Sequence, residues 1–292
     1  MQIVAQNLTY IYSEKSKQLA VRAVDDVTVT INEGDFFGII GHTGSGKSTF
    51  VQHLNGLIKV GKNKGKLTIG EFDLTDKKCD FKTLRGKVGM VFQYPEHQLF
   101  AETVFDDVAF GLKNFALELT EEQIKDRVKS ALEVVGLNYN AVKDKSPFEL
   151  SGGQKRRVAI AGVIVTRPEV LVLDEPVAGL DPRGKREFVE LLKYLHSSFV
   201  KTIIIVSHDM NLVAENCNRI GVFSKGKLVK VGSPKEIFEE EGNAKELGLD
   251  LPVTAYLTEQ LNRCGRNADN DFTERGFIDA VVKAFAKKGG ND

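Results

Sequence analysis

The stretch DFFGIIGHTGSGKST, residues 35–49, places a short apolar run directly before a glycine-rich segment. Gly41 to Ser48 match the pattern G-x-x-x-x-G-K-[ST], in which glycines let backbone N–H groups turn inward around a phosphate. The apolar run predicts a buried strand, and the residues after the loop predict a helix to about Gly56. A helix N-terminus adds favourable partial positive charge at this place. The stretch therefore predicts a nucleotide site at a strand end in an α/β protein.

Two side chains of this loop carry specific chemistry. Lys47 is expected to reach the β- and γ-phosphates of ATP, and the Ser48 hydroxyl is expected to ligate Mg²⁺. The nucleotide-binding residues predicted here are Gly41, His42, Thr43, Gly44, Ser45, Gly46, Lys47, Ser48 and Thr49.

Composition restricts the class of protein. Lys plus Arg and Asp plus Glu number 40 each, so the net charge is zero and a broad basic face for nucleic acid is not expected. Cys79, Cys217 and Cys264 show no CxxC spacing, which favours reduced thiols in a cytosolic protein. No apolar run approaches the roughly 18–20 residues of a membrane helix, and the first residues do not resemble a signal peptide. Any membrane connection is therefore expected to run through a partner.

Fully apolar runs later in the chain indicate a parallel sheet. VLVLD at 170–174 and TIIIVSH at 202–208 suit strands covered on both faces, and a helix between them supplies the crossover. Strands are also predicted from QIVAQNLTYIY, DDVTVTI and KVGMVFQ. A helix is expected over 120–136, where Thr120 and Gln123 form a capping-box pattern, and another begins at SPKEIFEEE.

Polar residues follow these strands directly. Asp174 ends one strand and is placed to hold Mg²⁺, while Glu175 is a candidate general base that activates water. His208 ends the next strand and could contact the γ-phosphate or orient the water. Gln93 follows KVGMVF and could sense both Mg²⁺ and the water. The sequence thus predicts a hydrolysis site at the carboxyl edge of the sheet.

The segment ELSGGQKRR, residues 149–157, predicts a second phosphate cradle at a helix start. The cradle formed by Ser151, Gly152 and Gly153 has neither a lysine nor a Mg²⁺ ligand within it, so it cannot be a complete nucleotide site. A second subunit placed head to tail would let each chain cover the phosphates held by its partner. Ser151, Gly152, Gly153 and Gln154 are therefore expected to act in trans.

With these motifs in order, the chain resembles the ATP-binding-cassette (ABC) transporter ATPases over residues 1 to about 240. LSGGQ is the signature of that family, Gln93 matches its Q-loop, Asp181 its D-loop and His208 its switch histidine. Tyr12 matches the aromatic residue that stacks on adenine. Val177 departs from the family, in which many members carry Ser or Thr.

The resemblance implies an α/β fold: a P-loop NTPase core with a mixed sheet flanked by helices and an N-terminal antiparallel β subdomain. It also implies the division into an ATPase domain over 1–240, with a helical subdomain inserted at about 94–165, and a C-terminal helical extension over 241–292. The cofactors implied are ATP and Mg²⁺, with Ser48, Gln93 and Asp174 around the metal. A sandwich dimer with two ATP molecules at its interface is implied as well.

Longer stretches of the sequence resemble one particular group within this family. QYPEHQLFAETVFDDVAFGLKN is similar to energy-coupling factor ATPases and cobalt/nickel importers, which take up vitamins or transition metals. This implies a peripheral protein at the cytoplasmic face of the membrane, with a second ATPase, a transmembrane coupling protein and a substrate-binding membrane subunit as partners. Other transporter ATPases, including exporters, soluble non-transport ATPases and a nucleotide sensor remain alternatives.

Two surfaces are predicted beyond the site. In the tail, Val253, Leu257 and Leu261 share one helical face, as do Phe277, Val281 and Phe285. The tail helices could pack on their own domain or pair with a second subunit, and both readings stay open. Nearer the site, Leu99 and Phe100 are expected to line a groove that receives a short helix of the membrane partner.

Overall fold

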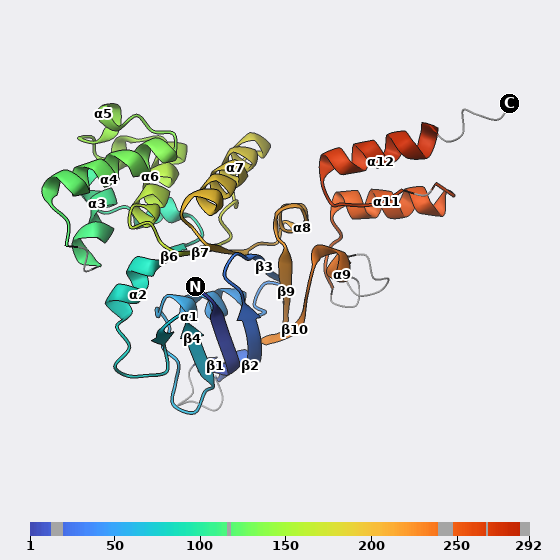
Figure 1. The fold of residues 1–292 in the computed structure, drawn as a ribbon, viewed down its shortest axis with the longest axis horizontal. Helices are drawn as coiled ribbons and strands as arrows, with labels where there is room; N and C mark the ends of the chain where they lie inside the picture. Colours follow the sequence, from blue (N-terminus) through green and yellow to red (C-terminus); the bar gives the residue numbers. More distant parts are fainter. Residues whose placement is uncertain (13–19, 116–117, 239–247, 267, 287–292) are drawn as a thin grey trace.

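The computed structural model of the protein describes residues 1–12, 20–115, 118–238, 248–266 and 268–286. Figure 1 shows two sheets in the middle of the molecule, a group of helices beyond one side and a pair of helices beyond the other. In the described part of the chain, no helix is both long and apolar enough to cross a membrane.

The larger sheet has six strands and carries the expected parallel core. β10 is antiparallel to β9, and the other neighbours are parallel, with Asp174 paired to Val206 at the carboxyl end of β7 and β8. Its strands in spatial order are β10 (Lys227–Gly232), β9 (Arg219–Ser224), β3 (Phe36–Gly41), β8 (Thr202–Val206), β7 (Val170–Asp174) and β6 (Val88–Val91).

The smaller sheet is antiparallel and comes mainly from the N-terminal part of the chain. Alternation along β1 places Ile3 and Ala5 in the core, as the period of a strand covered on one face requires, and a register shift after Ala5 brings Leu8 to the same face. The strands in spatial order are β2 (Val21–Ile31), β1 (Ile3–Tyr12), β4 (Lys66–Ile69) and β5 (Phe72–Asp73). The expected mixed sheet and antiparallel β subdomain are thus confirmed.

Helices connect these strands and gather at the β6 side in Figure 1. The capping box of Thr120 and Gln123 forms as expected, and Ser233 and Glu236 bond reciprocally at the start of α9. The helices up to Ile164 are α1 (Lys47–Leu54), α2 (Phe81–Lys87), the 3₁₀ turn η1 (Pro95–Gln98), α3 (Val104–Asn114), α4 (Glu121–Val134), α5 (Tyr139–Val142), the 3₁₀ turn η2 (Pro147–Glu149) and α6 (Gly152–Ile164). The later ones are α7 (Pro182–Ser198), α8 (Met210–Asn216), α9 (Pro234–Phe238), α11 (Val253–Arg263) and α12 (Glu274–Ala286).

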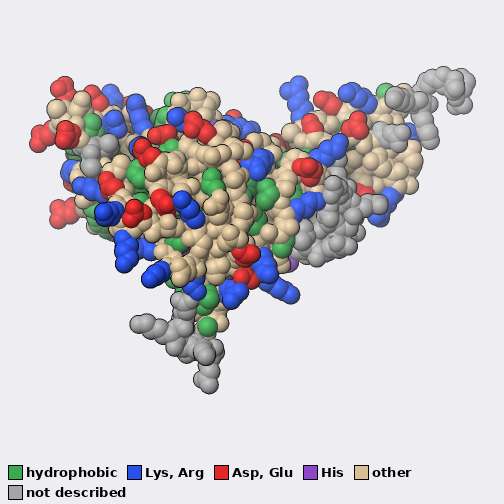
Figure 2. Space-filling model, turned by 60° about the horizontal axis from the view of Figure 1, so that its bottom comes forward, with side chains coloured by type: hydrophobic (Ala, Val, Ile, Leu, Met, Phe, Trp, Pro, Cys, Tyr) green, Lys and Arg blue, Asp and Glu red, His purple; other side chains and the backbone are tan. Residues whose placement is uncertain are grey.

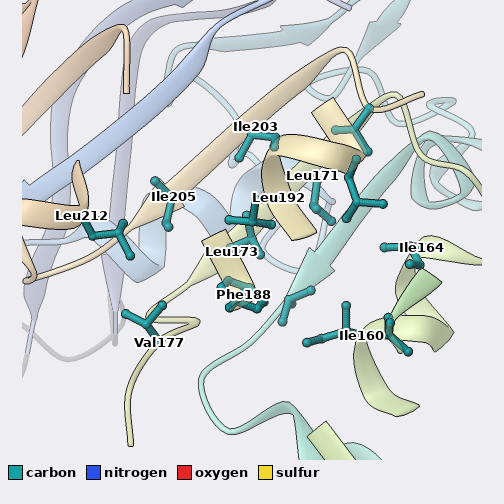
Figure 3. Packing of buried hydrophobic residues seen from close by; sticks show 14 of the residues in the cluster. Ile160, Ile164, Leu171, Leu173, Val177, Phe188, Leu192, Ile203, Ile205 and Leu212 are labelled. Atoms are coloured by element: carbon teal, nitrogen blue, oxygen red, sulfur yellow. The ribbon is translucent and has the colours of Figure 1, made fainter. Parts of the chain in front are cut away.

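The central strands are buried on both faces, which explains their continuous apolar sequences. Leu171 and Leu173 pack in a cluster with α6 and α7, seen in Figure 3, while Val170 and Val172 join a second cluster with α1 and the antiparallel sheet. Successive side chains of β7 therefore hold the sheet between the two clusters and fix the position of its carboxyl edge.

The two tail helices lie side by side and expose large apolar groups. Small residues of α11, Thr254, Ala255 and Thr258, are buried, and the Thr254 hydroxyl donates to the carbonyl of Phe272. The tail is anchored to the core where the Val253 N–H donates to Asn211 of α8, at 2.7 Å. The apolar side chains left exposed are Val253, Tyr256, Leu257, Ile278, Val282 and Phe285. Leu261, Phe277 and Val281 are half-buried, so the expected stripes are partly covered.

Charges are mixed on the face that Figure 2 shows, where Lys and Arg lie among Asp and Glu. This agrees with the zero net charge. Cys79, Cys217 and Cys264 are all unpaired, as their spacing predicted.

Candidate functional site

The loop after β3 has a backbone that requires glycine at two positions. Gly41 has φ 141°, and a Cβ there would lie 2.1 Å from the carbonyl oxygen of Phe223. Gly46 caps α1 with φ 102°, and a Cβ there would lie 2.0 Å from the carbonyl oxygen of Ala23. Both close atoms belong to the backbone, which cannot easily move aside to make room for a side chain. The chain therefore turns tightly from β3 into α1 and aims the start of the helix at the loop.

Lys47 lies inside this loop. Its Nζ donates to the carbonyl oxygens of Gly41 at 2.7 Å and His42 at 2.9 Å. Burial lowers the pKa of Lys47, and the nearby carboxylates of Glu175 and Asp174 oppose that shift. The ammonium group is thus held at the centre of the loop, beside the two acidic residues that end β7.

The loop offers the donors that a phosphate requires. The Ser45 hydroxyl is buried and has no hydrogen-bond partner among the described residues, which is costly unless a bound group supplies one. His42, Thr43 and Gly44 are exposed and line the open side of the loop. The residues present therefore fit a bound nucleotide phosphate.

Ser48 and Asp174 are brought together from α1 and β7. The Ser48 hydroxyl donates to the Asp174 carboxylate at 3.1 Å. Asp174 is buried, and burial raises its pKa against the opposing effects of the Ser48 bond and the Lys47 charge. No cluster of three or more His, Cys, Asp or Glu side chains that could hold a metal exists among the described residues. The pair of hard oxygen ligands fits Mg²⁺ that shares its coordination with phosphate.

Glu175 and His208 form the second pair of the site. His208 Nδ1 lies 2.8 Å from Glu175 Oε2, the histidine being largely exposed and the glutamate mostly buried. Burial raises the pKa of Glu175, and the charge and hydrogen bond of His208 act in the opposite direction. Glu175 has φ 49°, a left-handed conformation that few non-glycine residues adopt. Strained backbone conformations of this kind occur mostly at functional sites, which agrees with the prediction that Glu175 is the general base.

Two other predicted residues lie at the edge of this group. Tyr12 ends β1, is 41% exposed, and its hydroxyl lies 3.4 Å from Thr49 Oγ1 on α1. An exposed ring beside the phosphate-loop helix is available for stacking. Gln93 is exposed just beyond β6, and among the described residues no hydrogen bond joins its side chain to Ser48, Asp174 or Glu175. The Mg²⁺ role of Gln93 stays a prediction.

The second cradle is formed at the start of α6 and faces open space. Ser151 and Gln154 make a capping box, in which each side chain accepts the backbone N–H of the other. A Cβ at Gly152 or Gly153 would meet no atom within 4 Å, so no contact inside the chain requires glycine there. Within the described residues, no hydrogen bond joins 151–154 to the loop at 41–49. The cradle is therefore separate from the chain's own phosphate loop.

The segment after β7 is held in a fixed turn. The Asp181 carboxylate caps α7 by accepting the N–H of Gly184 at 2.7 Å. Val177 is buried in the cluster with Phe188 shown in Figure 3. An apolar side chain fits this position, which gives a physical reason for the departure from Ser or Thr.

One neighbour of the site was not predicted. Gly248 lies so close to His42 that a Cβ there would be 2.4 Å from His42 Nε2. The beginning of the tail thus runs against the phosphate loop. No local sequence pattern could have indicated a contact between residues so far apart in the chain.

Comparison with known proteins agrees with this geometry. The family model described as ABC transporter matches residues 24–178. The energy-coupling factor transporter ATP-binding protein EcfA2 of Clostridium tetani is 47% identical over 292 residues, which cover both chains fully. The protein of the same name from Clostridioides difficile is 49% identical over 93% of each chain.

Solved structures share the fold. The cbiO1 structure from Clostridium perfringens, described as part of the ABC transporter complex cbiONQ, has a TM-score of 0.71 and 37% identity over 88% of this chain and 98% of that one. The dimeric ATP-binding cassette MJ0796, bound to ADP and Pi in a post-hydrolysis state, has a TM-score of 0.70 and 28% identity over 80% and 98%. The chain belongs to the ABC transporter family, in its group of energy-coupling factor transporter ATP-binding proteins.

Proposed function

We propose that this chain is the ATP-hydrolysing subunit of an energy-coupling factor importer and works in a head-to-tail pair with a second, paralogous ATPase. Its further partners are a transmembrane coupling protein and a substrate-binding membrane subunit, and it lies at the cytoplasmic face of the membrane. The cargo we expect is a vitamin or a transition-metal ion. The two-domain division, 1–240 and 241–292, is part of this proposal.

The observation that carries the pairing is the open second cradle. A Cβ at Gly152 or Gly153 would meet no other part of the described chain within 4 Å, while Ser151 and Gln154 hold the start of α6 in place. A phosphate brought by another subunit can therefore approach the backbone N–H groups closely. The partner's ATP is the ligand that this surface fits.

Each of the predicted site residues has a separate role in hydrolysis. Lys47 turns its ammonium group from the carbonyl oxygens of Gly41 and His42 to the β- and γ-phosphates. Mg²⁺ held by Ser48 and Asp174 would neutralise phosphate charge. Glu175 accepts a proton from the attacking water, and His208 holds the Glu175 carboxylate in one orientation. Closure of the partner's cradle over the site excludes bulk water.

The exposed apolar face of the tail helices supports the pairing as well. Val253, Tyr256, Leu257, Ile278 and Val282 lie on two adjacent helices and remain accessible. Of the two roles left open by the sequence, we favour pairing with the second ATPase, because α11 and α12 already contact each other and still leave these apolar side chains exposed.

We propose that the membrane partner binds at a cavity of about 250 Å³ between η1, α3 and α6. Phe100 and Phe110 lie at this cavity and are 60% and 46% exposed, with ring centroids 4.9 Å apart in an edge-to-face arrangement. Leu99 also lines it but is 6% exposed, so it belongs more to the core than to a docking surface. The aromatic pair is therefore the part of the cavity that a short helix of the coupling protein would contact.

The test is affinity purification of the tagged chain from native membranes in detergent, followed by mass spectrometry. We expect a second cassette ATPase and two membrane proteins in defined ratio. A matched preparation of Lys47→Ala should retain the membrane proteins but lose the hydrolysis that takes place at this chain's own phosphate loop. Recovery of the chain with only soluble proteins would contradict the transport assignment.

A further inference from the structure

Arg156 is a buried cation in the signature helix that none of the predicted roles uses. It lies on α6, two residues beyond Gln154, and is 7% exposed. Its guanidinium donates to two carbonyl oxygens, that of Ala178 at 3.0 Å and that of Pro176. Both carbonyls belong to the turn that directly follows Glu175.

This turn sets the position of the hydrolytic carboxylate. The Glu175 N–H donates to the carbonyl of Val206 at 3.0 Å, and the Ala178 N–H donates to the carbonyl of Glu175 at 3.2 Å. Glu175 itself has the left-handed φ of 49°. A residue in this conformation keeps it only where its surroundings fix the chain on both sides. Arg156 supplies two of the bonds on the far side of Glu175.

The same arginine also faces the segment that follows Gln93. Glu96 of η1 and Tyr94 are the charged and titratable groups that oppose the lowering of the Arg156 pKa by burial. Arg156 Nε and Glu96 Oε2 are both buried, and neither has a hydrogen-bond partner in the described part of the chain. A Cβ at Gly179 would lie 3.7 Å from the ring of Tyr94, so this segment also touches the turn after Glu175. Arg156 therefore stands where three segments of the site meet.

A purely structural role explains this arrangement poorly. Among the described residues, no carboxylate lies within ion-pair distance of Arg156, and a buried cation without one is costly. The neighbouring Arg157 does have such a partner, because it donates to Glu187 at 2.9 Å and to the carbonyl of Val135 at 3.0 Å. An apolar residue at 156 would pack without that cost.

We propose that Arg156 is a positioning residue that ties the turn after Glu175 to α6, and so couples this chain's own hydrolysis site to the cradle that it offers to the partner's ATP. The proposal rests on the proposed function, since it needs both sites of the pair. When α6 moves with the partner's phosphate, the two carbonyls move with it, and Glu175 changes position. The unpaired Nε and Glu96 carboxylate give the arginine a second set of bonds to form in the moved state.

The test compares Arg156→Met with Arg157→Met in the assembled complex. Turnover is measured per bound ATP, with the number of bound ATP determined on the same sample, because partial unfolding lowers binding stoichiometry rather than turnover per site. Misplacing a reacting group by about 1 Å can cost roughly a hundredfold in rate. We therefore expect Arg156→Met to lose at least about tenfold in turnover per bound ATP with little change in ATP affinity. Arg157→Met should lower thermal stability more than turnover per site.

The conservative variant gives a second reading. Lysine keeps the charge but lacks the planar fork that reaches two carbonyls at once, so Arg156→Lys should fall between wild type and Arg156→Met. If Arg156→Met does not fold, Arg156→Lys decides alone. A several-fold loss of turnover per bound ATP, with the full number of ATP molecules bound, then supports the proposal. Wild-type turnover per bound ATP in the folded Met variant, or in Lys where Met fails, overturns it.

Failure of this inference can be told from failure of the proposed function. If wild-type complex hydrolyses no ATP above the level of Lys47→Ala, the proposed function is wrong. If wild type hydrolyses ATP and Arg156→Met matches it, only the coupling role of Arg156 is wrong.

Discussion

His208 Nδ1 and Glu175 Oε2 lie 2.8 Å apart at the carboxyl ends of two adjacent parallel strands. The pairing of Asp174 with Val206 places both residues just past the same edge of the sheet. The histidine can orient the carboxylate while leaving its other oxygen free for water. We therefore expect Glu175 to accept the proton of the attacking water and His208 to orient the Glu175 carboxylate.

Replacing Glu175 with Gln should keep ATP binding and nearly stop turnover. The amide has the size of the carboxylate but cannot accept the proton of water, and general bases contribute about 10²–10⁴-fold. We expect a loss of at least about a hundredfold in ATPase rate, with the variant accumulating as an ATP-bound dimer. Equilibrium ATP binding and size-exclusion chromatography check both points. A variant with wild-type turnover would place the base elsewhere.

His208→Ala should move the acidic limb of the ATPase pH profile upward. Burial raises the pKa of Glu175, so the carboxylate becomes protonated, and inactive as a base, at a pH above the ordinary range for Glu. The charge and hydrogen bond of His208 lower that pKa, and removing them lets it rise further. The test is kcat against pH for wild type and variant, with thermal stability measured at each pH. A limb that stays in place or shifts downward contradicts this assignment.

Lys47→Ala should abolish tight ATP binding. The side chain is the cation buried in the phosphate loop, and no other Lys or Arg lies within 41–49 to replace it. The phosphate charge would then lack its counterion in a confined site. Titration with a fluorescent ATP analogue should show affinity lost by orders of magnitude, while circular dichroism confirms the fold. Unaltered micromolar binding would remove the nucleotide assignment of this loop.

The sequence predicts this site well because strand order and motif order are linked. β3, β7 and β8 are continuous apolar runs, and each is followed by polar residues at the same edge of the sheet. Ser48, Asp174, Glu175 and His208 can therefore be placed together from the sequence alone. β4, β5, β9 and β10 were not predicted. β10 alternates half-buried and exposed residues over only a short span, which gives a weak pattern.

Contacts between segments that are distant in the chain could not be predicted from the sequence. The bonds from Arg156 to Pro176 and Ala178 join residues about twenty apart that belong to no shared motif. Leu99 lines the same cavity as Phe100, but its side chain is buried rather than open to a partner, because it also packs into the cluster of α3 and α6. An apolar residue in a loop can face either way, and only the packing of neighbouring helices decides.

Gly153→Ala should leave the stability of the fold intact but impair hydrolysis at the partner's site. A Cβ there meets nothing within 4 Å, and alanine favours a helix over glycine by up to about 1 kcal/mol, so stability should be unchanged or slightly higher. The methyl group would still obstruct a phosphate brought by the partner. In a pair whose own phosphate loop carries Lys47→Ala, the remaining hydrolysis should be lost on adding Gly153→Ala. If the added change instead leaves that activity intact, and Gly153→Ala alone impairs the site that uses Lys47, the head-to-tail arrangement is wrong.

The last prediction concerns transmission to the membrane. Phe100 and Phe110 form an exposed aromatic pair beside the cavity between η1, α3 and α6, and Phe100 follows Gln93 by seven residues in the sequence. Changing both to Glu adds two charges at a surface expected to receive an apolar helix, and buried unpaired charge is strongly unfavourable. We expect the membrane partner to dissociate or uptake to be uncoupled, while the isolated ATPase pair hydrolyses ATP at its normal rate. Exposed Tyr194 on α7, 53% accessible and away from this cavity, provides a matched Tyr194→Glu control that should retain assembly. Complex assembly is measured by pull-down and uptake in proteoliposomes, and full transport by the double variant would remove this surface from the mechanism.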